Sequence, residues 1–235
     1  MARLGFCLNA IARFRNLYKE RVPDPAAAAI AAEMAGVDGI LVHLREDRSD
    51  ITDRDVTILK DVVQSHLNLA VPLNDEMVKK AMGWLPDMVT LTPTVREESR
   101  RNSLDVTGQM EYLEDVVAAL RANNIVVSAL IALEAKQIRA AARIRLDFVQ
   151  FNTVPLAHFE DLGTMHDYVE QLRSAAAAAN KLGLGVAVGR GINYQNAREL
   201  TDNSTIEEVN AGHAICARAL LVGIERSVAD FRALL

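Results

Sequence analysis

Residues 125–152 read IVVSALIALEAKQIRAAARIRLDFVQFN, and this stretch holds the unit from which the fold can be inferred. Ile125–Ile131 and Phe148–Asn152 are short runs of mainly apolar residues, which predict buried strands. The longer amphipathic segment between them, Glu134–Arg145, predicts a helix. Strands that are apolar nearly throughout are typical of a parallel sheet whose outer face is covered by helices.

The same strand-then-helix unit recurs along the whole chain. Further strands are predicted at Leu4–Leu8, Gly39–His43, Asn68–Val71, Met88–Leu91, Gly185–Gly189 and Glu208–Ala211. Further helices are predicted at Pro25–Gly36, Thr52–Val63, Asn74–Leu85, Gly108–Asn123, Thr164–Leu182, Tyr194–Thr201 and from Ala214 to the end. Eight such units in 235 residues predict an α/β fold, the closed (β/α)8 TIM barrel. An open doubly wound sheet is the alternative, but no G-x-G-x-x-G follows the first strand. Because no linker or change of composition interrupts the chain, we expect residues 1–235 to form one domain.

Composition and charge exclude several classes of protein. Half of the residues are hydrophobic and 24% are charged, which excludes a disordered chain, and two cysteines are too few for a disulfide framework. The net charge of −5 disfavours general binding to nucleic acid or to a membrane surface, since both are anionic. No run approaches the ~18 consecutive apolar residues of a membrane span. We therefore expect a cytoplasmic protein.

In a barrel of this type, active sites lie where the strands end. The segment VHLREDRSDITDRD, residues 42–55, begins at such an end. One interpretation makes His43 a general acid or base, with Arg45 and Arg48 binding an anion. The other is a solvated loop with internal ion pairs.

Two glycine-containing segments end the seventh and eighth strands, Gly189-Arg190-Gly191 and Gly212-His213. Their backbone N–H groups could hold a phosphate, as those two loops do in many barrels, or they could be ordinary turns. No cluster of residues has metal-ligand spacing, so no metal is expected.

The remaining reactive and basic residues have ordinary structural interpretations. The two cysteines are expected to be small core residues, and three histidines are expected at the surface. The segment Arg96–Arg101 is either a mobile basic loop over the barrel mouth or, as we favour, a plain solvated loop. The cysteines are Cys7 and Cys216, and the histidines are His66, His158 and His166.

Several motifs closely resemble the pyridoxine 5′-phosphate synthase (PdxJ) family, and they follow its order over nearly the whole chain. They are VHLREDRSDITDRD at 42–55, PDP at 23–25, NL at 68–69, LDV at 104–106, LGLGVAVGRGINYQN at 182–196 and NAGHAI at 210–215. The resemblance implies a (β/α)8 barrel with additional helices, assembled as a homo-oligomer, often an octamer. It also implies condensation of 3-amino-2-oxopropyl phosphate with 1-deoxy-D-xylulose 5-phosphate, without a metal or organic cofactor.

The resemblance carries over part of the family's site. His43 matches the catalytic histidine, and Asn9 matches an asparagine that contacts the amine substrate. Arg45 matches an arginine of the deoxyxylulose phosphate site. The residues that match the site of the aminooxopropyl phosphate are Gly191, Gly212 and His213.

Other positions depart from the family's pattern. The strand-one motif N-x-D-H-I-A is matched by Asn9-Ala-Ile-Ala12 if the Asp-His pair is deleted. Ala70 replaces a catalytic glutamate and cannot transfer a proton. Arg190 replaces a histidine, and because it stays charged it can bind an anion but not act as an acid.

Two further replacements are Gln150 for a glutamate and Asp50 for a histidine. These changes leave three hypotheses open: a diverged synthase, a paralogous enzyme with another phosphorylated or anionic substrate, and a non-catalytic protein that binds a phosphorylated metabolite. Whether the chain is an enzyme stays open at this point.

Overall fold

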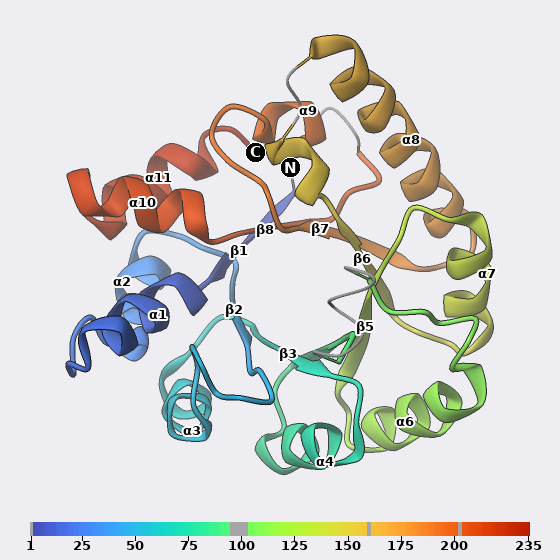
Figure 1. The fold of residues 1–235 in the computed structure, drawn as a ribbon, viewed down its shortest axis with the longest axis horizontal. Helices are drawn as coiled ribbons and strands as arrows, with labels where there is room; N and C mark the ends of the chain where they lie inside the picture. The colour runs from blue at the N-terminus through green and yellow to red at the C-terminus, as the bar shows by residue number, and fades with distance from the viewer. Residues whose placement is uncertain (1, 95–102, 159–160, 202–203) are drawn as a thin grey trace.

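The computed structural model describes residues 2–94, 103–158, 161–201 and 204–235, and its eight strands form a closed parallel barrel ringed by helices (Figure 1). The strands pair in sequence order, and the first pairs with both the second and the last: Phe6 is in register with Ile40 and with Ala211. This closure confirms the predicted barrel and excludes the open sheet. The strands are β1 Arg3–Cys7, β2 Gly39–His43, β3 Leu67–Pro72, β4 Met88–Thr92, β5 Val126–Ile131, β6 Phe148–Asn152, β7 Gly185–Gly189 and β8 Glu208–Ala211.

The helices lie outside the barrel, and most agree with the sequence pattern to within a few residues. Asp24 and Thr52 cap α2 and α3 through their side chains, and Asn74 does so for α4. The helices are α1 Asn9–Tyr18, α2 Pro25–Met34, α3 Asp53–Val62, α4 Asp75–Trp84, α6 Met110–Ala122, α7 Ala135–Arg143, η1 Val154–Ala157 (a 3₁₀ helix), α8 Leu162–Lys181, α9 Ala197–Thr201, α10 His213–Val222 and α11 Ile224–Arg232.

Two differences from the predicted elements provide the additional helices. The sequence pattern did not predict α1, which begins at Asn9, two residues after β1 ends. The single helix expected from Ala214 onward is divided into α10 and α11 at Gly223. Gly223 has φ +84°, a left-handed conformation that glycine adopts without steric cost, so the chain turns there.

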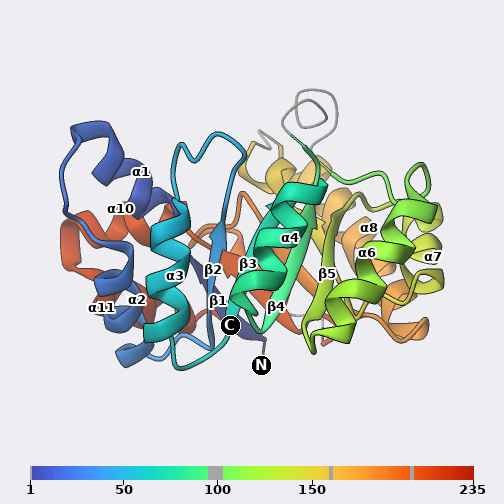
Figure 2. The same ribbon diagram turned by 90° about the horizontal axis from the view of Figure 1, so that it is seen from below.

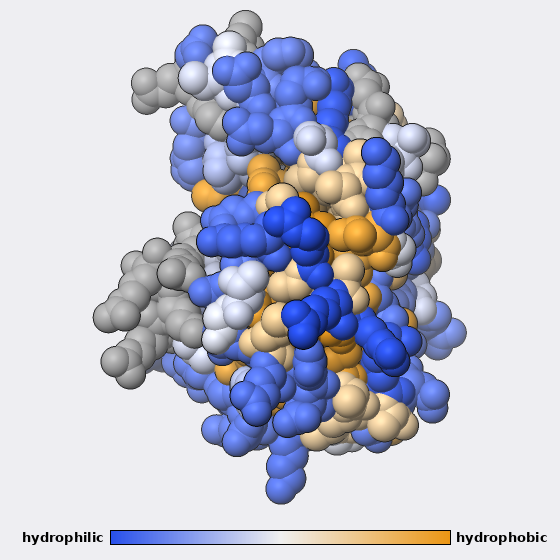
Figure 3. Space-filling view, turned by 90° about the vertical axis from the view of Figure 1, so that its right-hand side faces the viewer, coloured by the Kyte–Doolittle hydropathy of each residue, from blue (hydrophilic) through white to orange (hydrophobic). Residues whose placement is uncertain are grey.

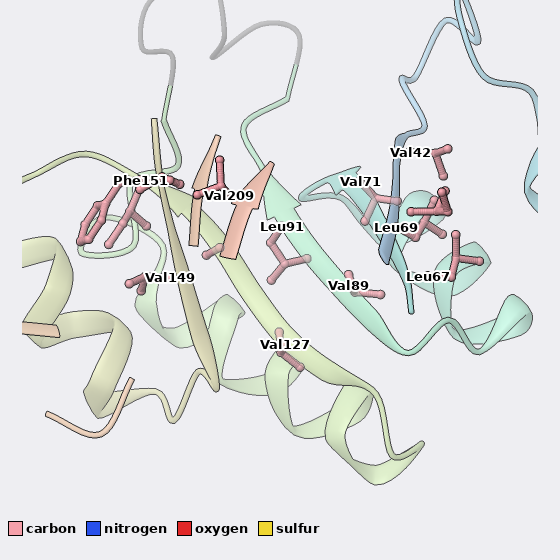
Figure 4. Close-up of a cluster of buried hydrophobic side chains, with 14 of the residues drawn as sticks. Val42, Leu67, Leu69, Val71, Val89, Leu91, Val127, Val149, Phe151 and Val209 are labelled. Carbon is pink, nitrogen blue, oxygen red and sulfur yellow. The ribbon is translucent and has the colours of Figure 1, made fainter. Parts of the chain in front are cut away.

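The main core lies between the sheet and the helices, not inside the barrel. Outward-pointing strand residues such as Val42, Leu69 and Phe151 are fully buried there (Figure 4). On the helix side, α2 contributes the small residues Ala29 and Ala32, both fully buried. Small side chains allow the helix backbone to lie close to the sheet, which explains the low aromatic content of 5%.

The interior of the barrel is filled differently, with glycines opposite polar side chains. A Cβ atom placed on Gly5 of β1 would overlap Oδ1 of Asn210 on β8. Nearby, Thr90 donates a hydrogen bond to Asn68 Oδ1 at 2.9 Å. The lower barrel is therefore closely packed, with a void of only about 10 Å³ beside Gly5 and Asn210.

The two ends of the barrel differ in what they carry. In Figure 2 both chain termini lie at the end where the strands begin. The β2–α3 loop rises at the opposite end, where the strands finish. Within the described ranges, no helix is both long and apolar enough to cross a membrane.

Candidate active site

A cavity of about 270 Å³ opens at the carboxyl ends of the strands. It lies at the barrel end where the sequence analysis placed the site. Five of the seven predicted site residues line it: His43, Arg190, Gly191, Gly212 and His213. The other two, Asn9 and Arg45, lie outside its lining.

The loop after β7 is held in a fixed shape by neighbouring side chains. Thr153 Oγ1 donates to the carbonyls of Gly189 and Arg190 at 3.0 and 2.6 Å, and Asn196 Nδ2 donates to that of Gly191 at 2.9 Å. Gly191 has φ +70°, and a Cβ atom there would lie 2.8 Å from the Thr153 carbonyl oxygen. Only glycine fits this position, so the loop is preorganised beside the cavity.

The start of α10 forms the neighbouring wall. Gly212, His213 and Ala214 all line the cavity, and the first turn of a helix has backbone N–H groups without an intrahelical acceptor. Those groups and the helix dipole favour an anion. Together with the guanidinium of Arg190, they give the β7–β8 side of the cavity a positive pole.

His43 ends β2, and both its ring and its backbone are held in place. Its Nε2 lies 3.2 Å from Thr92 Oγ1. The side-chain amide of Asn9 bonds the backbone of His43 twice: Nδ2 donates to the His43 carbonyl at 2.8 Å, and Oδ1 accepts from the His43 N–H at 2.7 Å. In this structure Asn9 therefore positions His43 and does not face the cavity.

The residue of β1 that does face the cavity is Cys7. Burial raises the pKa of its thiol, so the side chain is a neutral thiol at neutral pH. The motif N-x-D-H-I-A also matches residues 7–12 without a deletion, which places Cys7 at its asparagine and Asn9 at its aspartate. The geometry favours this ungapped match. Strand alternation, with Leu4 and Phe6 facing outward, was the signal that could have identified Cys7.

The replaced positions lie in the cavity wall. Ala70 is in register with His43 on the adjacent strand, and Gln150 is buried with its Oε1 3.5 Å from Asn210 Nδ2. Among the described residues that line the cavity, none is an aspartate or a glutamate. The ionisable lining groups are therefore His43, His213, Arg190 and Cys7, which suits an anionic ligand.

The two arginines of the β2–α3 loop pair with carboxylates, Arg45 within the loop and Arg48 with a glutamate of α4. Arg45 Nε lies 3.7 Å from Asp50, and Arg48 Nη2 lies 3.0 Å from Glu76. Arg48 also donates to the backbone carbonyl of Glu46 at 2.6 Å. Both arginines thus have partners within the fold.

The other residues singled out from the sequence occupy ordinary positions, with one difference. Cys216 is buried, and His158 and His166 are exposed as expected. His66 is half-buried at the amino-terminal end of the barrel, because its ring packs against Gly39. The segment Arg96–Arg101 lies outside the described residues. Across the described ranges, no group of three or more His, Cys, Asp or Glu side chains could hold a metal ion.

The chain is similar to known proteins over nearly its whole length. Residues 4–235 match the model of a family described as pyridoxal phosphate biosynthesis protein PdxJ. A pyridoxine 5′-phosphate synthase from Prochlorococcus marinus is 41% identical, covering 100% of this chain and 99% of the relative. One from Geotalea daltonii is 39% identical, over 98% and 97%. A solved structure of phosphoribosylanthranilate isomerase from Thermotoga maritima matches with a TM-score of 0.63 at 14% identity, over 100% and 98%, which shows a shared fold alone.

Proposed function

Because this chain belongs to the PdxJ family, we propose that it acts on a small phosphorylated metabolite in the cavity, with His43 as the proton-transfer group. One observation carries the proposal: Arg190, the fixed loop at Gly191 and the start of α10 converge on one side of the cavity. These are the groups that hold phosphate esters in many barrels. His43 reaches the same cavity from β2, which is separated from β8 by β1 alone.

This arrangement assigns separate tasks to the two sides. The phosphate binds at the β7–β8 side and fixes the orientation of the molecule, so that its carbon skeleton extends toward His43. Thr92 holds the imidazole ring and Asn9 holds its backbone, so the ring is presented in one orientation. A positioned histidine can remove or donate a proton near neutral pH, which typically contributes ~10²–10⁴ in rate.

Two observations favour different versions of this function. Identity of about 40% with pyridoxine 5′-phosphate synthases favours their reaction or a related one. Ala70 and Gln150 in the cavity wall favour a protein that binds a phosphorylated ligand without turning it over. We place the enzyme first, because His43 is retained and held by two neighbours.

The experiment measures binding and turnover with the same preparation. Isothermal titration with inorganic phosphate tests whether the positive pole binds an anion. Arg190→Gln should weaken the affinity for phosphate about tenfold, which is the contribution of one charge-assisted hydrogen bond. Arg226→Gln is the matched control, since Arg226 is an exposed arginine of α11 that pairs with Asp230, four residues further along the same helix. Phosphate that does not bind, or that binds equally to both variants, would refute the proposed site.

Turnover is then tested with 3-amino-2-oxopropyl phosphate and 1-deoxy-D-xylulose 5-phosphate, and with a panel of other phosphorylated metabolites. Pyridoxine 5′-phosphate formation that is lost in His43→Asn supports the reaction of the relatives. Turnover of another panel member supports the paralogous enzyme. Saturable binding without turnover of any compound supports the non-catalytic candidate over the enzyme.

We further propose that copies of this chain associate through the face formed by α1, α2 and α10. Nine of the eleven exposed large hydrophobic side chains in the described ranges lie there or in the segment joining α1 to α2. These helices are neighbours on one side of the barrel (Figure 1). On the face over α7 and α8, hydrophilic residues flank a central band of hydrophobic ones (Figure 3). The nine residues are Phe14, Leu17, Tyr18, Val22, Ile30, Met34, Leu220, Leu221 and Val222.

Light scattering after gel filtration tests this association. Leu221→Glu should reduce the mass of the assembly, because Leu221 is 86% exposed in the isolated chain. Leu182→Glu, at the end of α8 on the other face, is the matched control and should leave the mass unchanged. A monomeric wild-type protein would refute the association. We keep a cytoplasmic location as part of the proposal, which the two free cysteines support.

A further inference from the structure

Gln150 of β6 places a buried side-chain amide in the wall of the cavity. The residue is 6% exposed and belongs to the cavity lining. Its Oε1 accepts a hydrogen bond from Asn210 Nδ2 at 3.5 Å. Within the described ranges its Nε2 has no hydrogen-bond partner, and this atom is not among the fully enclosed ones that lack a partner. The N–H donors of Nε2 are therefore open to a ligand in the cavity.

Glu208 sets the orientation of this amide from beneath the cavity. Asn210 Nδ2 donates to Glu208 Oε1 at 2.8 Å. The Glu208 side chain is buried, and its Oε2 lies 3.6 Å from Arg3 Nη2. A carboxylate paired with an arginine only accepts hydrogen bonds, so Asn210 has to turn its NH₂ group toward Glu208. The same NH₂ group meets Gln150, which therefore presents its oxygen to Asn210 and its nitrogen to the cavity.

The amide nitrogen lies beside the loop that follows β7. A Cβ atom on Gly189, the last residue of β7, would lie only 2.6 Å from Gln150 Nε2, so glycine leaves room for the amide at this place. The carbonyl of Gly189 accepts the hydrogen bond from Thr153 Oγ1 that helps to fix the loop. The open donor is thus next to the proposed phosphate site.

A donor at this position selects the chemistry of the ligand. A carbonyl or hydroxyl oxygen accepts a hydrogen bond from Nε2, whereas an ammonium group only donates and would leave the amide unpaired. The described residues of the lining include no aspartate or glutamate that could pair with a cation. A site built to hydrogen-bond one group rejects an analogue without it, because the buried polar group then stays unpaired.

We propose that Gln150 is a specificity-determining residue, which donates from Nε2 to a carbonyl or hydroxyl oxygen close to the phosphate group of the ligand. Glu208 is a positioning residue that acts through Asn210. The inference rests on the proposed function, because it takes the phosphate to be bound by the adjacent loop. The substrate class is a phosphate monoester with an oxygen function, and not an ammonium group, on the carbon next to the one that bears the phosphate.

Three esters of the same chain length test the proposal by isothermal titration: 2-oxopropyl phosphate, 2-aminopropyl phosphate and propyl phosphate. Wild-type protein should bind the oxo ester about tenfold more tightly than propyl phosphate, and the amino ester no more tightly than propyl phosphate. Gln150→Met removes the donor at similar length, so its affinities for the oxo and propyl esters should agree within about twofold. Gln150→Glu reverses the polarity and should bind the amino ester most tightly.

Gln64→Glu is the matched control. It makes the same change at an exposed glutamine between α3 and β3, at the end of the barrel where the strands begin, and should keep the wild-type order of affinities. Glu208→Gln tests the positioning role, because a glutamine can also donate and lets the Asn210 amide reverse. The preference for the oxo ester should then fall below about threefold while the affinity for inorganic phosphate is kept, whereas a merely structural role would weaken all ligands alike.

Each outcome bears on a different claim. If wild-type protein binds the oxo and propyl esters equally, or the amino ester most tightly, the inference is overturned and the proposed function stands. A preference for the oxo ester that persists in Gln150→Met also overturns it, because another group then makes the contact. If neither inorganic phosphate nor any ester binds the wild-type protein, the proposed function fails and the inference fails with it. Should Gln150→Glu not fold by circular dichroism, the wild-type order and Gln150→Met decide.

Discussion

Replacing Asn9 by alanine tests how the structure positions His43. The substitution removes both hydrogen bonds between the Asn9 amide and the His43 backbone, at 2.8 and 2.7 Å. Each contributes about 1 kcal/mol, so the free energy of unfolding should fall by about 2 kcal/mol. Asn9 is the first residue of α1, where alanine carries no helix penalty, so the loss can be assigned to these two bonds and to the weaker one that Asn9 Oδ1 accepts from the Cys7 thiol at 3.5 Å.

For a chain of this length, 1 kcal/mol corresponds to about 2–4 °C in melting temperature, so we expect a decrease of about 4–8 °C. Differential scanning calorimetry measures it. Asn9→Asp keeps the acceptor for the His43 N–H but loses the donor. Its melting temperature should therefore lie between those of Asn9→Ala and the wild type. Asn123→Ala is the control, because it removes one exposed bond to Ala119 and should change the melting temperature by less than 1 °C. If the melting temperature of Asn9→Ala falls by no more than that of Asn123→Ala, Asn9 does not hold His43 and the reasoning is refuted.

Three further predictions follow from other parts of the molecule. Gly5→Ala should destabilise the protein by about 3 kcal/mol, seen in urea unfolding, because the new methyl group overlaps Asn210; a change below 1 kcal/mol would contradict the packing. Burial alone would raise the pKa of Asp55, but bonds from Arg15 and Thr52 outweigh it and lower that pKa below 3.8. The pairing thus stabilises the fold above pH 3.8, and that stabilisation is lost as the pH falls through the lowered value. Asp55→Asn should therefore cost about 3 kcal/mol at pH 7 and less at pH 3, and an equal loss at both would refute the pairing. Burial raises the pKa of Cys216 to about 12 and also raises the pKa of Cys7. Iodoacetamide at pH 7.5 should therefore label the folded protein far more slowly than the urea-unfolded chain.

Parts of the site could be predicted from the sequence because they follow strand ends. His43 and Gly191 lie at the carboxyl ends of β2 and β7, and a parallel barrel brings all such ends to one rim. The pairing of Asn9 with His43 could not be predicted in this way, since it joins residues 34 positions apart through side-chain orientation. The same limit applied to Asp50, whose sequence neighbours do not reveal that Arg13 of α1 reaches it.

The sequence by itself determined the eight strand-helix units, the closed barrel and the end at which the cavity opens. These follow from the alternation of apolar runs with amphipathic ones, because local hydrophobic periodicity and strand order are written along the chain. The tertiary structure alone decided which side chains face the cavity: Cys7 does, while Asn9 and Arg45 are turned to partners inside the fold. A one-residue step along a strand reverses the direction in which a side chain points. The partner that the side chain then meets belongs to a segment distant in the sequence. The pairing of charged side chains is therefore fixed only when the chain has folded.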